Sequence, residues 1–488
     1  MFLGLDFGTS SVKGVVMDGR QKIMAAASSP LTVSRPRPGW SEQNPAHWWR
    51  ACNAVIAQLR KKKPGAMAAV EGIGLSGQQH GATLLDASGK VLRPAILWND
   101  ARAFAECTEM ETAEPRARDI SGNSALAGFT APKLLWVRKH EPRTFERVAK
   151  VLLPKDYIRY RMTGDYASDL SDASGTHWLD VGKRQWSEEL LAASAMRRDQ
   201  MPELFEGSAA TGRLSPAVAR AWGMAKRPVV AGGGGDNAAS ACGMGAIHDN
   251  DAFLSLGTSG VIFVANRQFR PNPARAVHAF CHAVPDCWHQ MGVILNAAGS
   301  LEWLSGLLAA PVPKLLAALG TRTRGPAANL FLPYLSGERT PVGDSEVRGL
   351  LMGLAHETDR KVLTQTVLEG VAFALRENLD AIAATGTSID RLWAVGGGSR
   401  SPLWLSIMAT VLNLPIDLPA AGEVGGAFGA ARLGMIAATG APPATVLTPP
   451  KRARTFRPDQ GLRQAYDDAY HRYVNLYPAI RTINRRHD

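Results

Sequence analysis

The chain has 488 residues, of which 45% are hydrophobic and 20% are charged, so it can bury the cores of two or three domains without disulfides or metals. The formal net charge is +12, but the basic residues are scattered and no aromatic-basic interleaving accompanies them, which indicates a solvated basic face and no nucleic-acid partner. No signal-peptide pattern and no run of about 18 apolar residues occurs, and the five cysteines form no CxxC pair, so we expect a cytoplasmic protein with reduced thiols and no membrane partner.

The N-terminal segment predicts three strands joined by short turns, in the strings FLGLDFG, VKGVVMD and KIMAAAS. A helical pattern follows from Ala46 to Lys62. A buried strand is then expected from Val70 to Leu75, and it stops at the polar sequence Ser76-Gly77-Gln78-Gln79-His80. Strands followed by alternating helix and strand predict a mixed α/β domain with its functional groups at the strand ends.

A second domain of the same kind is expected to open near Ala252. Before it, Pro228 to Ala231 predicts a strand that runs into the glycines 232–235 and then Asp236. Glycine gives the backbone the freedom to change direction, so this run is the best candidate for a crossing between domains.

A Gly-Thr-Ser turn between apolar strands occurs twice, at Gly8-Thr9-Ser10 and, about half the chain later, at Gly257-Thr258-Ser259. Each turn taken alone also fits an ordinary hairpin. A repeat at this distance indicates two related domains that face one another, each with a small turn that binds an anion. We therefore predict that the two turns clamp one polyphosphate.

The first turn carries charge. Asp6 stands at the end of the strand before it, and a carboxylate beside bound phosphates requires a divalent cation between them. Thr9, Ser10 and the backbone N–H groups would bind phosphate oxygens, and Lys13 would neutralise them.

The second turn lacks this charge. Ser255 takes the place of Asp6, and Ile262 takes that of Lys13. Thr258 would therefore contact phosphate oxygens without a metal ligand or a cation beside it. The two halves of the predicted clamp are unequal.

A third glycine-rich segment is the apolar strand Trp393 to Val395, followed by Gly396-Gly397-Gly398 and a helix from Pro402 to Leu412. The close approach that Gly397 and Gly398 permit suits the flat face of a base or ribose, although the same string also fits a tight turn. The Walker pattern of phosphate-binding loops is absent, so any nucleotide site is of another type.

Asp236 follows the glycine run at a predicted helix start. In isolation it also fits an N-cap aspartate without catalytic duty. Beside a phosphate clamp, a carboxylate can take the proton of a hydroxyl that accepts the phosphoryl group. The strings Gln78-Gln79-His80 and Trp98-Asn99-Asp100 supply polar groups and one aromatic wall, which is how a protein holds a small polyol.

A set of longer strings is far more specific than any single glycine motif: WSEQNPAHWW, GQQHGATLLD, VLRPAILWND, FTAPKLLWV, VLLPKDY, RMTGDYASDLSDASGT, GGDNAA, SLGTSG and FLPYLSGERTP. In these strings the chain resembles the FGGY carbohydrate kinases, and within them the bacterial kinases of xylulose. The resemblance covers roughly residues 1 to 435.

The resemblance implies an α/β fold of two ribonuclease-H-like domains, as in actin, hexokinase and the Hsp70 ATPase, with a cleft between them. It implies that the sugar binds mainly to an N-terminal domain of residues 1–246, which also carries the first phosphate turn. ATP and Mg²⁺ would bind mainly to a C-terminal domain of residues 247–488. The implied activity is ATP-dependent phosphorylation of D-xylulose to D-xylulose 5-phosphate.

Position by position, the resemblance makes Asp236 the base for the sugar hydroxyl and places Asp6 and Asp236 at the metal. Gln79 and His80 correspond to a substrate-contacting pair. The other implied contacts are Trp98 and Asn237 for the sugar, and Thr9, Ser10, Lys13, Thr258, Gly397 and Gly398 for ATP.

Three departures from the family pattern stand out. Gln79 replaces the methionine expected before the histidine, which makes the pocket more polar and leaves the exact sugar open. The glycine run before Asp236 is one residue longer than the shortest family form. Val362 and Thr366 differ from the C-terminal signature, on a predicted helix away from the chemistry.

Two alternatives remain open at this point. Another kinase of the family, for ribulose, gluconate or glycerol, would share the ATP machinery and differ only around residues 77–100 and 236–237. An actin-like or Hsp70-like ATP-switched binding protein could use the same paired turns, but it would need no base facing a polyol pocket. No stripe of the sequence stands out as an interface, which leaves a homodimer open.

Overall fold

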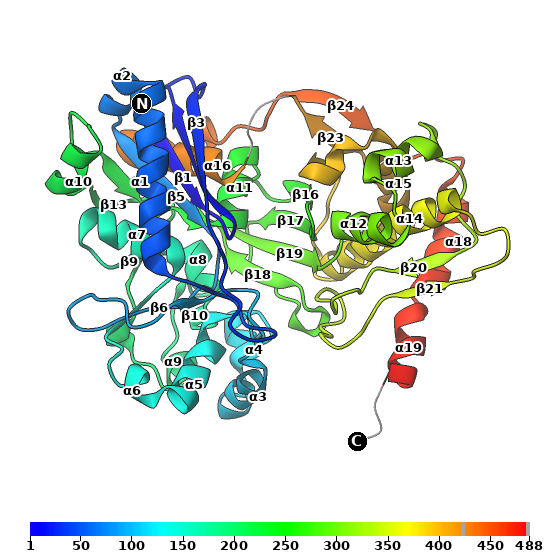
Figure 1. Cartoon of the computed structure of the whole chain (residues 1–488), viewed down its shortest axis with the longest axis horizontal. Helices are drawn as coiled ribbons and strands as arrows, with labels where there is room; N and C mark the ends of the chain where they lie inside the picture. The colour runs from blue at the N-terminus through cyan, green and yellow to red at the C-terminus, as the bar shows by residue number, and fades with distance from the viewer. Residues whose placement is uncertain (421–424, 485–488) are drawn as a thin grey trace.

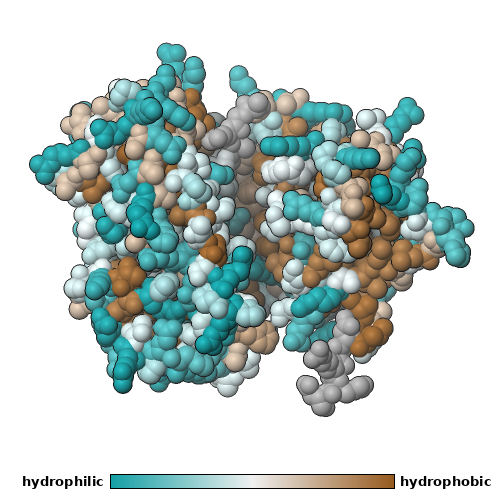
Figure 2. Space-filling view, in the orientation of Figure 1, coloured by the Kyte–Doolittle hydropathy of each residue, from teal (hydrophilic) through white to brown (hydrophobic). Residues whose placement is uncertain are grey.

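The computed structural model describes residues 1–420 and 425–484, which form two α/β halves, each built on a seven-stranded mixed sheet. Figure 1 shows the two halves side by side, with the N-terminal sheet on the left and the C-terminal sheet on the right. The space-filling view in Figure 2 is hollowed between the two halves. Residues 485–488, at the end of the basic tail, lie outside the described residues.

The N-terminal sheet has the strand order β13-β14-β5-β1-β2-β3, and β15 pairs with β5. β1, β2 and β3 are antiparallel neighbours, whereas β5 runs parallel to both β1 and β14. The bounds are β1 Phe2–Phe7, β2 Ser11–Met17, β3 Ile23–Pro30, β5 Gly72–Gly77, β13 Ala210–Arg213, β14 Val229–Ala231 and β15 Gly234–Gly235.

The C-terminal sheet has the order β18-β19-β17-β16-β22-β23-β24. β16, β17 and β19 are antiparallel neighbours, and β22 runs parallel to both β16 and β23. The bounds are β16 Ala252–Leu256, β17 Gly260–Asn266, β18 His278–Cys281, β19 Trp288–Ile294, β22 Leu392–Val395, β23 Ile416–Pro419 and β24 Arg452–Phe456.

The two sheets repeat one arrangement, three antiparallel strands followed by two parallel ones. β3-β2-β1-β5-β14 in the first sheet corresponds to β19-β17-β16-β22-β23 in the second. The repeat predicted from two short turns is therefore a repeat of whole sheets, and the predicted two-domain α/β architecture is confirmed.

The two first hairpins differ in register. Asp6 pairs with Lys13 across β1 and β2, whereas Ser255 pairs with Val261 across β16 and β17. The alignment of Ile262 with Lys13 is therefore wrong by one residue, because the second hairpin joins its strands through one residue fewer. Valine is as uncharged as isoleucine, so the predicted difference in charge between the turns is unaffected.

Helices cover both faces of the N-terminal sheet. α1 (Pro45–Lys62) buries an apolar stripe against β2 and β3. On the other face, α16 (Gly426–Thr439) lies between β1, β5 and α11 (Asp236–Met244). A Cβ atom on Gly4 or Gly74 would collide with the backbone of α16, so only glycine permits this approach. The chain thus returns from the C-terminal half to pack on the first sheet.

The C-terminal half has its own large core. The long helix α14 (Arg360–Ala383) packs against β19, β20 and α15. The other elements of this region are β20 Leu330–Leu332, β21 Leu350–Met352, α12 Ala298–Leu307, α13 Val312–Leu319, α15 Pro402–Leu412, α18 Arg463–Tyr473 and α19 Leu476–Asn484.

A separate lobe follows β5 and has a third core. It is drawn in the lower left of Figure 1. Its main elements are β6 Thr83–Leu85, β7 Ala95–Ile96, α3 Phe104–Ala113, α5 Thr130–His140, β8 Lys150–Leu152, β9 Ala167–Asp169 and α8 Leu170–Ser174. In the same stretch of the chain, α7 Pro154–Thr163 packs on α1 and β5 in the core of the N-terminal sheet.

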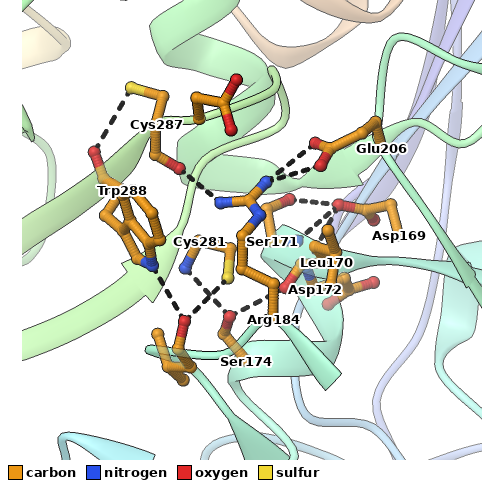
Figure 3. A network of polar contacts seen from close by, with 12 residues as sticks. Asp169, Leu170, Ser171, Asp172, Ser174, Arg184, Glu206, Cys281, Cys287 and Trp288 are labelled. Atoms are coloured by element: carbon orange, nitrogen blue, oxygen red, sulfur yellow. Dashed lines mark hydrogen bonds and ion pairs between the residues drawn. The ribbon is translucent and has the colours of Figure 1, made fainter. Parts of the chain in front are cut away.

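This lobe contacts the C-terminal half through polar groups. Arg184 donates to the carbonyl of Cys287 at 2.9 Å and to both carboxylate oxygens of Glu206 at 2.8 Å (Figure 3). Trp288 Nε1 donates to the carbonyl of Val181 at 2.8 Å. These bonds tie β19 and the turn before it to the lobe that carries α8.

Within residues 1–420 and 425–484, no helix is long and apolar enough to cross a membrane. All five cysteines are free, and four of them are buried, as the irregular spacing predicted.

Candidate active site

Asp6 stands near the end of β1, between Ser76 on β5 and Lys13 on β2. Ser76 Oγ donates a hydrogen bond to Asp6 Oδ1 at 2.8 Å. The first turn of α16 lies against the same carboxylate, since a Cβ atom on Gly426 would be 3.0 Å from Asp6 Oδ1. Burial raises the pKa of Asp6, and the Ser76 hydrogen bond and the charge of Lys13 offset only part of this effect.

Asp236 is the first residue of α11, and Gly235 is its N-cap. The aspartate is therefore not the capping residue that the alternative interpretation required. Its Oδ1 accepts from the backbone N–H of Asn237 at 2.8 Å and from Asn237 Nδ2 at 3.0 Å. Over the described part of the chain no other group hydrogen-bonds this carboxylate, so Oδ2 is free to meet a ligand.

The two carboxylates influence one another. Burial, followed by the charge of Asp6, raises the pKa of Asp236 to about 7. A carboxylate with a pKa near neutrality can accept a proton during a reaction and lose it again afterwards. Asn237 orients this carboxylate through both of its nitrogen donors, and its role as a sugar contact stays a prediction.

The same pair fits a magnesium ion. Two neighbouring half-buried carboxylates with raised pKa values are a donor set that a divalent cation would stabilise. In the described ranges no three acidic, histidine or cysteine residues gather into a metal cage. Mg²⁺ commonly takes only one or two protein carboxylates and completes its shell with phosphate and water oxygens, so Asp6 and Asp236 suit it.

His80 follows β5 with a left-handed backbone (φ 68°), a conformation uncommon outside glycine. Its Nδ1 lies 2.6 Å from the carbonyl of Gly175, so Nδ1 carries the hydrogen and Nε2 is the acceptor. Burial, and then the charge of Lys133, lower the pKa of His80 to about 3, which keeps the ring neutral. Nε2 can therefore accept a hydrogen bond from a hydroxyl group.

The side chain of Gln79, which precedes His80, is turned toward α8. Its Nε2 donates to the carbonyl of Ser171 on α8 at 3.3 Å, and the side chain is buried. The side chain also fills the space where a Cβ atom of Gly235 would stand. Nε2 of this carboxamide is thus turned toward α8, while the more polar sugar pocket that the sequence predicted from Gln79 stays a prediction.

Thr9 and Trp98 belong to one hydrogen-bonded network. Trp98 Nε1 donates to Thr9 Oγ1 at 3.0 Å, and Thr9 Oγ1 donates to Gln78 Oε1 at 2.9 Å. Gln43 Nε2 donates to the Thr9 carbonyl at 2.8 Å. The first turn is thereby connected to the half-exposed indole of Trp98, while Ser10 beside it is exposed.

In the C-terminal half, Thr258 is exposed at the turn between β16 and β17. Its carbonyl accepts from the N–H groups of Ala297 at 2.7 Å and Gly299 at 3.1 Å, and the Gly257 carbonyl accepts from Ala298 at 3.0 Å. The turn is therefore fixed by the start of α12, and the methyl group of Thr258 lies beside Gly299, where an added Cβ atom would be 3.1 Å from it.

The two predicted adenosine glycines differ from one another. A Cβ atom on Gly397 would meet nothing within 4 Å, whereas on Gly398 it would lie 2.9 Å from both Leu256 and Trp404. Gly397 thus borders open space, where a ligand could approach the backbone. Gly398 is required for packing between β16 and α15.

A cavity of about 490 Å³ opens beside Asp6, between β2, β3 and the start of α16. Lys13 on β2 and Lys62 on α1 contribute positive charge to its lining, and Gln58 adds an amide. Cationic and amide donors of this kind suit anionic oxygens.

Sequence reasoning missed a guanidinium on the sugar side. Arg339 Nη1 donates to His278 Nε2 at 3.4 Å, and the charge of Arg339 also lowers the pKa of His80. His278 in turn contacts Asn123 Oδ1 at 3.2 Å through Nδ1. The string FLPYLSGERTP contains Arg339, but nothing in it indicates that this loop reaches the other half of the molecule.

Buried Lys133 was also missed. Its Nζ donates to the carbonyl of His80 at 2.9 Å, and burial lowers its pKa to about 7. An unusual lysine inside the apolar string FTAPKLLWV is the signal that could have drawn attention to it. Lys133 and Thr130 together hold the strained backbone of His80.

Sequence profiles of one family match both halves of this chain. The N-terminal domain of the FGGY family of carbohydrate kinases matches residues 1–243, and its C-terminal domain matches residues 252–438. The chain therefore belongs to the FGGY family of carbohydrate kinases, which transfer phosphate to a sugar hydroxyl with ATP as the donor. The family expected from the sequence strings is confirmed, while the division at residues 246 and 247 stays a prediction.

Individual kinases of this family are similar to the chain over almost its whole length. A xylulose kinase of Escherichia coli strain K12 is 47% identical over 488 residues, 99% of this chain and 98% of that protein. A xylulose kinase of Bacillus subtilis strain 168 is 35% identical, over 99% of this chain and 97% of that protein. A crystal structure described as a "xyloylose kinase" from Brucella ovis is 56% identical, with a TM-score of 0.97, over 99% of this chain and 100% of that one.

Proposed function

We propose that this protein transfers the γ-phosphoryl group of ATP to the 5-hydroxyl of D-xylulose. The observation that carries the proposal is the carboxylate of Asp236, which has one oxygen without a donor among the described residues and a pKa of about 7 beside Asp6. The similarity to xylulose kinases over nearly the whole chain supports D-xylulose as the sugar.

In this mechanism Asp236 Oδ2 accepts the proton of the 5-hydroxyl. The sugar oxygen forms a bond to the γ-phosphorus, while the bond from that phosphorus to the β,γ-bridging oxygen breaks and ADP leaves. The proton returns to solvent from Asp236 after the product leaves. Asn237 keeps Oδ1 occupied and so directs Oδ2 toward the hydroxyl.

The remaining sugar hydroxyls are bound by two uncharged side chains and one guanidinium. His80 accepts a hydroxyl hydrogen at Nε2, and the indole of Trp98 forms one wall. Arg339 from the C-terminal half, which lies beside His278 and near His80, donates to sugar oxygens. Closure of the two halves around the sugar would exclude water and limit hydrolysis of ATP.

On the nucleotide side, the backbone at Gly397 borders the adenosine and the turn at Thr258 contacts the phosphates. Lys13 and the first turn contact the phosphates from the N-terminal half. Asp6 and Asp236 would hold Mg²⁺, which supplies charge neutralisation on the phosphate oxygens when it is bound.

A coupled ADP-release assay with D-xylulose, D-ribulose, gluconate and glycerol tests the proposal. We expect kcat/KM for D-xylulose to exceed that for each other polyol by at least about tenfold, the scale on which binding pockets separate similar substrates. ³¹P NMR of the product should show a phosphate monoester on carbon 5. A preference for another polyol would refute the sugar assignment, and no stimulation by any polyol would refute the kinase.

A further inference from the structure

Gln79 is buried immediately beside the backbone that carries Asp236. An ideal Cβ atom on Gly235 would lie 2.5 Å from Gln79 Nε2, 2.7 Å from its Cδ and 2.8 Å from its Cγ. The Gln79 side chain thus lies flat against the residue that precedes the catalytic aspartate. Any movement of Gln79 would leave Gly235 without this support.

Ser171 on α8 connects Gln79 to the same turn. Its carbonyl accepts from Gln79 Nε2 at 3.3 Å, and its hydroxyl accepts from the backbone N–H of Gly235 at 3.2 Å. The hydroxyl donates in turn to Asp169, which also accepts from the Ser171 N–H at 2.8 Å (Figure 3). One serine therefore holds both the turn and the side chain that supports it.

A buried ion cluster around Lys155 holds Asp169, the residue that binds Ser171. Lys155 Nζ lies 2.7 Å from Asp169, 3.3 Å from Asp172 and 2.5 Å from Asp156, and all four side chains are at most 1% exposed. Breaking a buried ion pair by removing one partner leaves an uncompensated charge, so such a cluster holds its members in one arrangement. The chain from Lys155 through Asp169 and Ser171 to Gly235 is continuous and solvent-free.

We propose that Gln79 is a positioning residue for Asp236, acting through Gly235 and Ser171, and not a ligand of the sugar. This inference rests on the proposed function of Asp236 as the base. Within the described residues Gln79 Nε2 donates one hydrogen bond, to Ser171, so one of its two hydrogens is used to hold the side chain against α8 and Gly235. His80, the next residue, presents its free Nε2 and remains the sugar contact.

The expected kinetic effect of losing Gln79 follows from the position of Asp236. A displacement of about 1 Å in a catalytic group lowers the rate of the chemical step by roughly 100-fold, while ground-state binding of the sugar is little changed. Loss of a positioning residue should therefore lower kcat and leave KM almost unchanged. Loss of a direct sugar contact should raise KM.

The experiment compares four variants with the wild-type enzyme in steady-state assays with D-xylulose and ATP. Gln79→Ala removes the support, and Gln79→Met keeps its length and volume but loses the bond to Ser171. Ser171→Ala removes the hydroxyl that holds the Gly235 N–H. His80→Ala is the contrasting sugar-contact variant.

We expect kcat of Gln79→Ala to fall by roughly 30- to 100-fold with less than about a threefold change in KM for D-xylulose. Gln79→Met should recover most of that loss, and Ser171→Ala should lower kcat in the same way as Gln79→Ala. His80→Ala should raise KM by about tenfold or more.

A tenfold rise in KM of Gln79→Ala at unchanged kcat would overturn the proposal, as would unchanged kcat and KM in both Gln79 variants. If Gln79→Ala fails to fold, the same division between kcat and KM in Gln79→Met and Ser171→Ala decides. If the wild-type enzyme prefers another polyol, the sugar assignment fails, and the positioning role is tested by the same comparison with that polyol.

Discussion

The two Gly-Thr-Ser turns occupy equivalent places in two equivalent sheets, yet their surroundings differ. At the first turn, Asp6 receives a hydrogen bond from Ser76 and faces the start of α16. At the second, the carbonyls of Gly257 and Thr258 bind the first N–H groups of α12. The first turn therefore lies beside a carboxylate, whereas the second is hydrogen-bonded to the start of a helix.

This difference indicates how a repeated fold acquires an asymmetric function. Both turns can present backbone N–H groups to phosphate oxygens, because that property depends on the hairpin itself. Of the two turns, the first has Asp6 and Lys13 beside it, and Asp236, the proposed base, comes from a helix outside both hairpins. From this difference between the turns, we expect substitutions at the charged groups of the first turn to affect the chemical step. Substitutions at the second turn should affect ATP binding.

The largest effect is expected from Asp236→Asn, which keeps the shape of the side chain but cannot accept a proton. We predict that kcat falls by about 10³-fold or more, since a positioned base contributes up to about 10⁴-fold. ATP binding, measured by isothermal titration calorimetry, should remain within about threefold of the wild-type value. Turnover within tenfold of the wild-type rate would contradict the role of Asp236.

The next effect comes from making the first turn like the second. Asp6→Ser should lower kcat by roughly 100-fold, because the Mg²⁺ that neutralises the phosphate oxygens would lose one of its protein ligands. The matched control is Ser255→Ala, which should stay within about threefold of the wild-type rate. Activity is measured as a function of free Mg²⁺, and an unchanged Mg²⁺ dependence in Asp6→Ser would contradict the assignment.

A smaller effect is expected from substitutions of Gly397 and Gly398, which should differ in what they change. Gly397→Ala adds a methyl group in open space, so it should raise KM for ATP by about tenfold without changing Tm. Gly398→Ala forces contacts with Leu256 and Trp404, so it should lower the free energy of unfolding by about 1–3 kcal/mol. Equal effects of the two variants on KM and on thermal melting would show that Gly397 does not border the nucleotide.

The smallest effect is a pH-dependent difference in stability. Burial and Asp6 raise the pKa of Asp236 from 3.8 to about 7, so the folded protein binds this proton more tightly than the unfolded chain. The favourable contribution of the protonated group is complete below about pH 4 and is lost as the pH rises through 7. Asparagine does not titrate in this range, so Asp236→Asn does not lose this contribution to stability as the pH rises.

The Tm of Asp236→Asn should therefore rise relative to the wild-type Tm between pH 5 and pH 8. The comparison is made by differential scanning calorimetry without nucleotide or Mg²⁺. A Tm difference that stays constant over this range would mean that the aspartate is ionised throughout.

Local signals predicted many elements closely. The helix expected from Pro402 to Leu412 has those bounds, because proline starts it, the Ser401 side chain caps it and Asn413 ends it in a left-handed conformation. The helix expected from Ala46 to Lys62 begins one residue earlier, at Pro45. These signals lie within the segment itself, so the sequence contains them in full.

Other elements depended on distant partners. The strand expected at Val70 to Leu75 is found at Gly72–Gly77, because its ends are set by pairing with β1, in which Phe2 lies opposite Gly72. The return of α16 to the first sheet was not predicted, since the approach of its backbone to Gly4 and Gly74 leaves no periodic pattern in either segment.

The sequence by itself determined the repeated turns, the unequal charge between them and the candidates Asp6, Asp236 and His80 for the proposed chemistry. Those properties depend on residue type and on spacing along the chain. Only the tertiary structure decided where the groups point: the free oxygen of Asp236, the acceptor nitrogen of His80 and the inward carboxamide of Gln79. Direction depends on partners such as Gly175 and Ser171, which lie far away in the sequence and come close only when the chain folds.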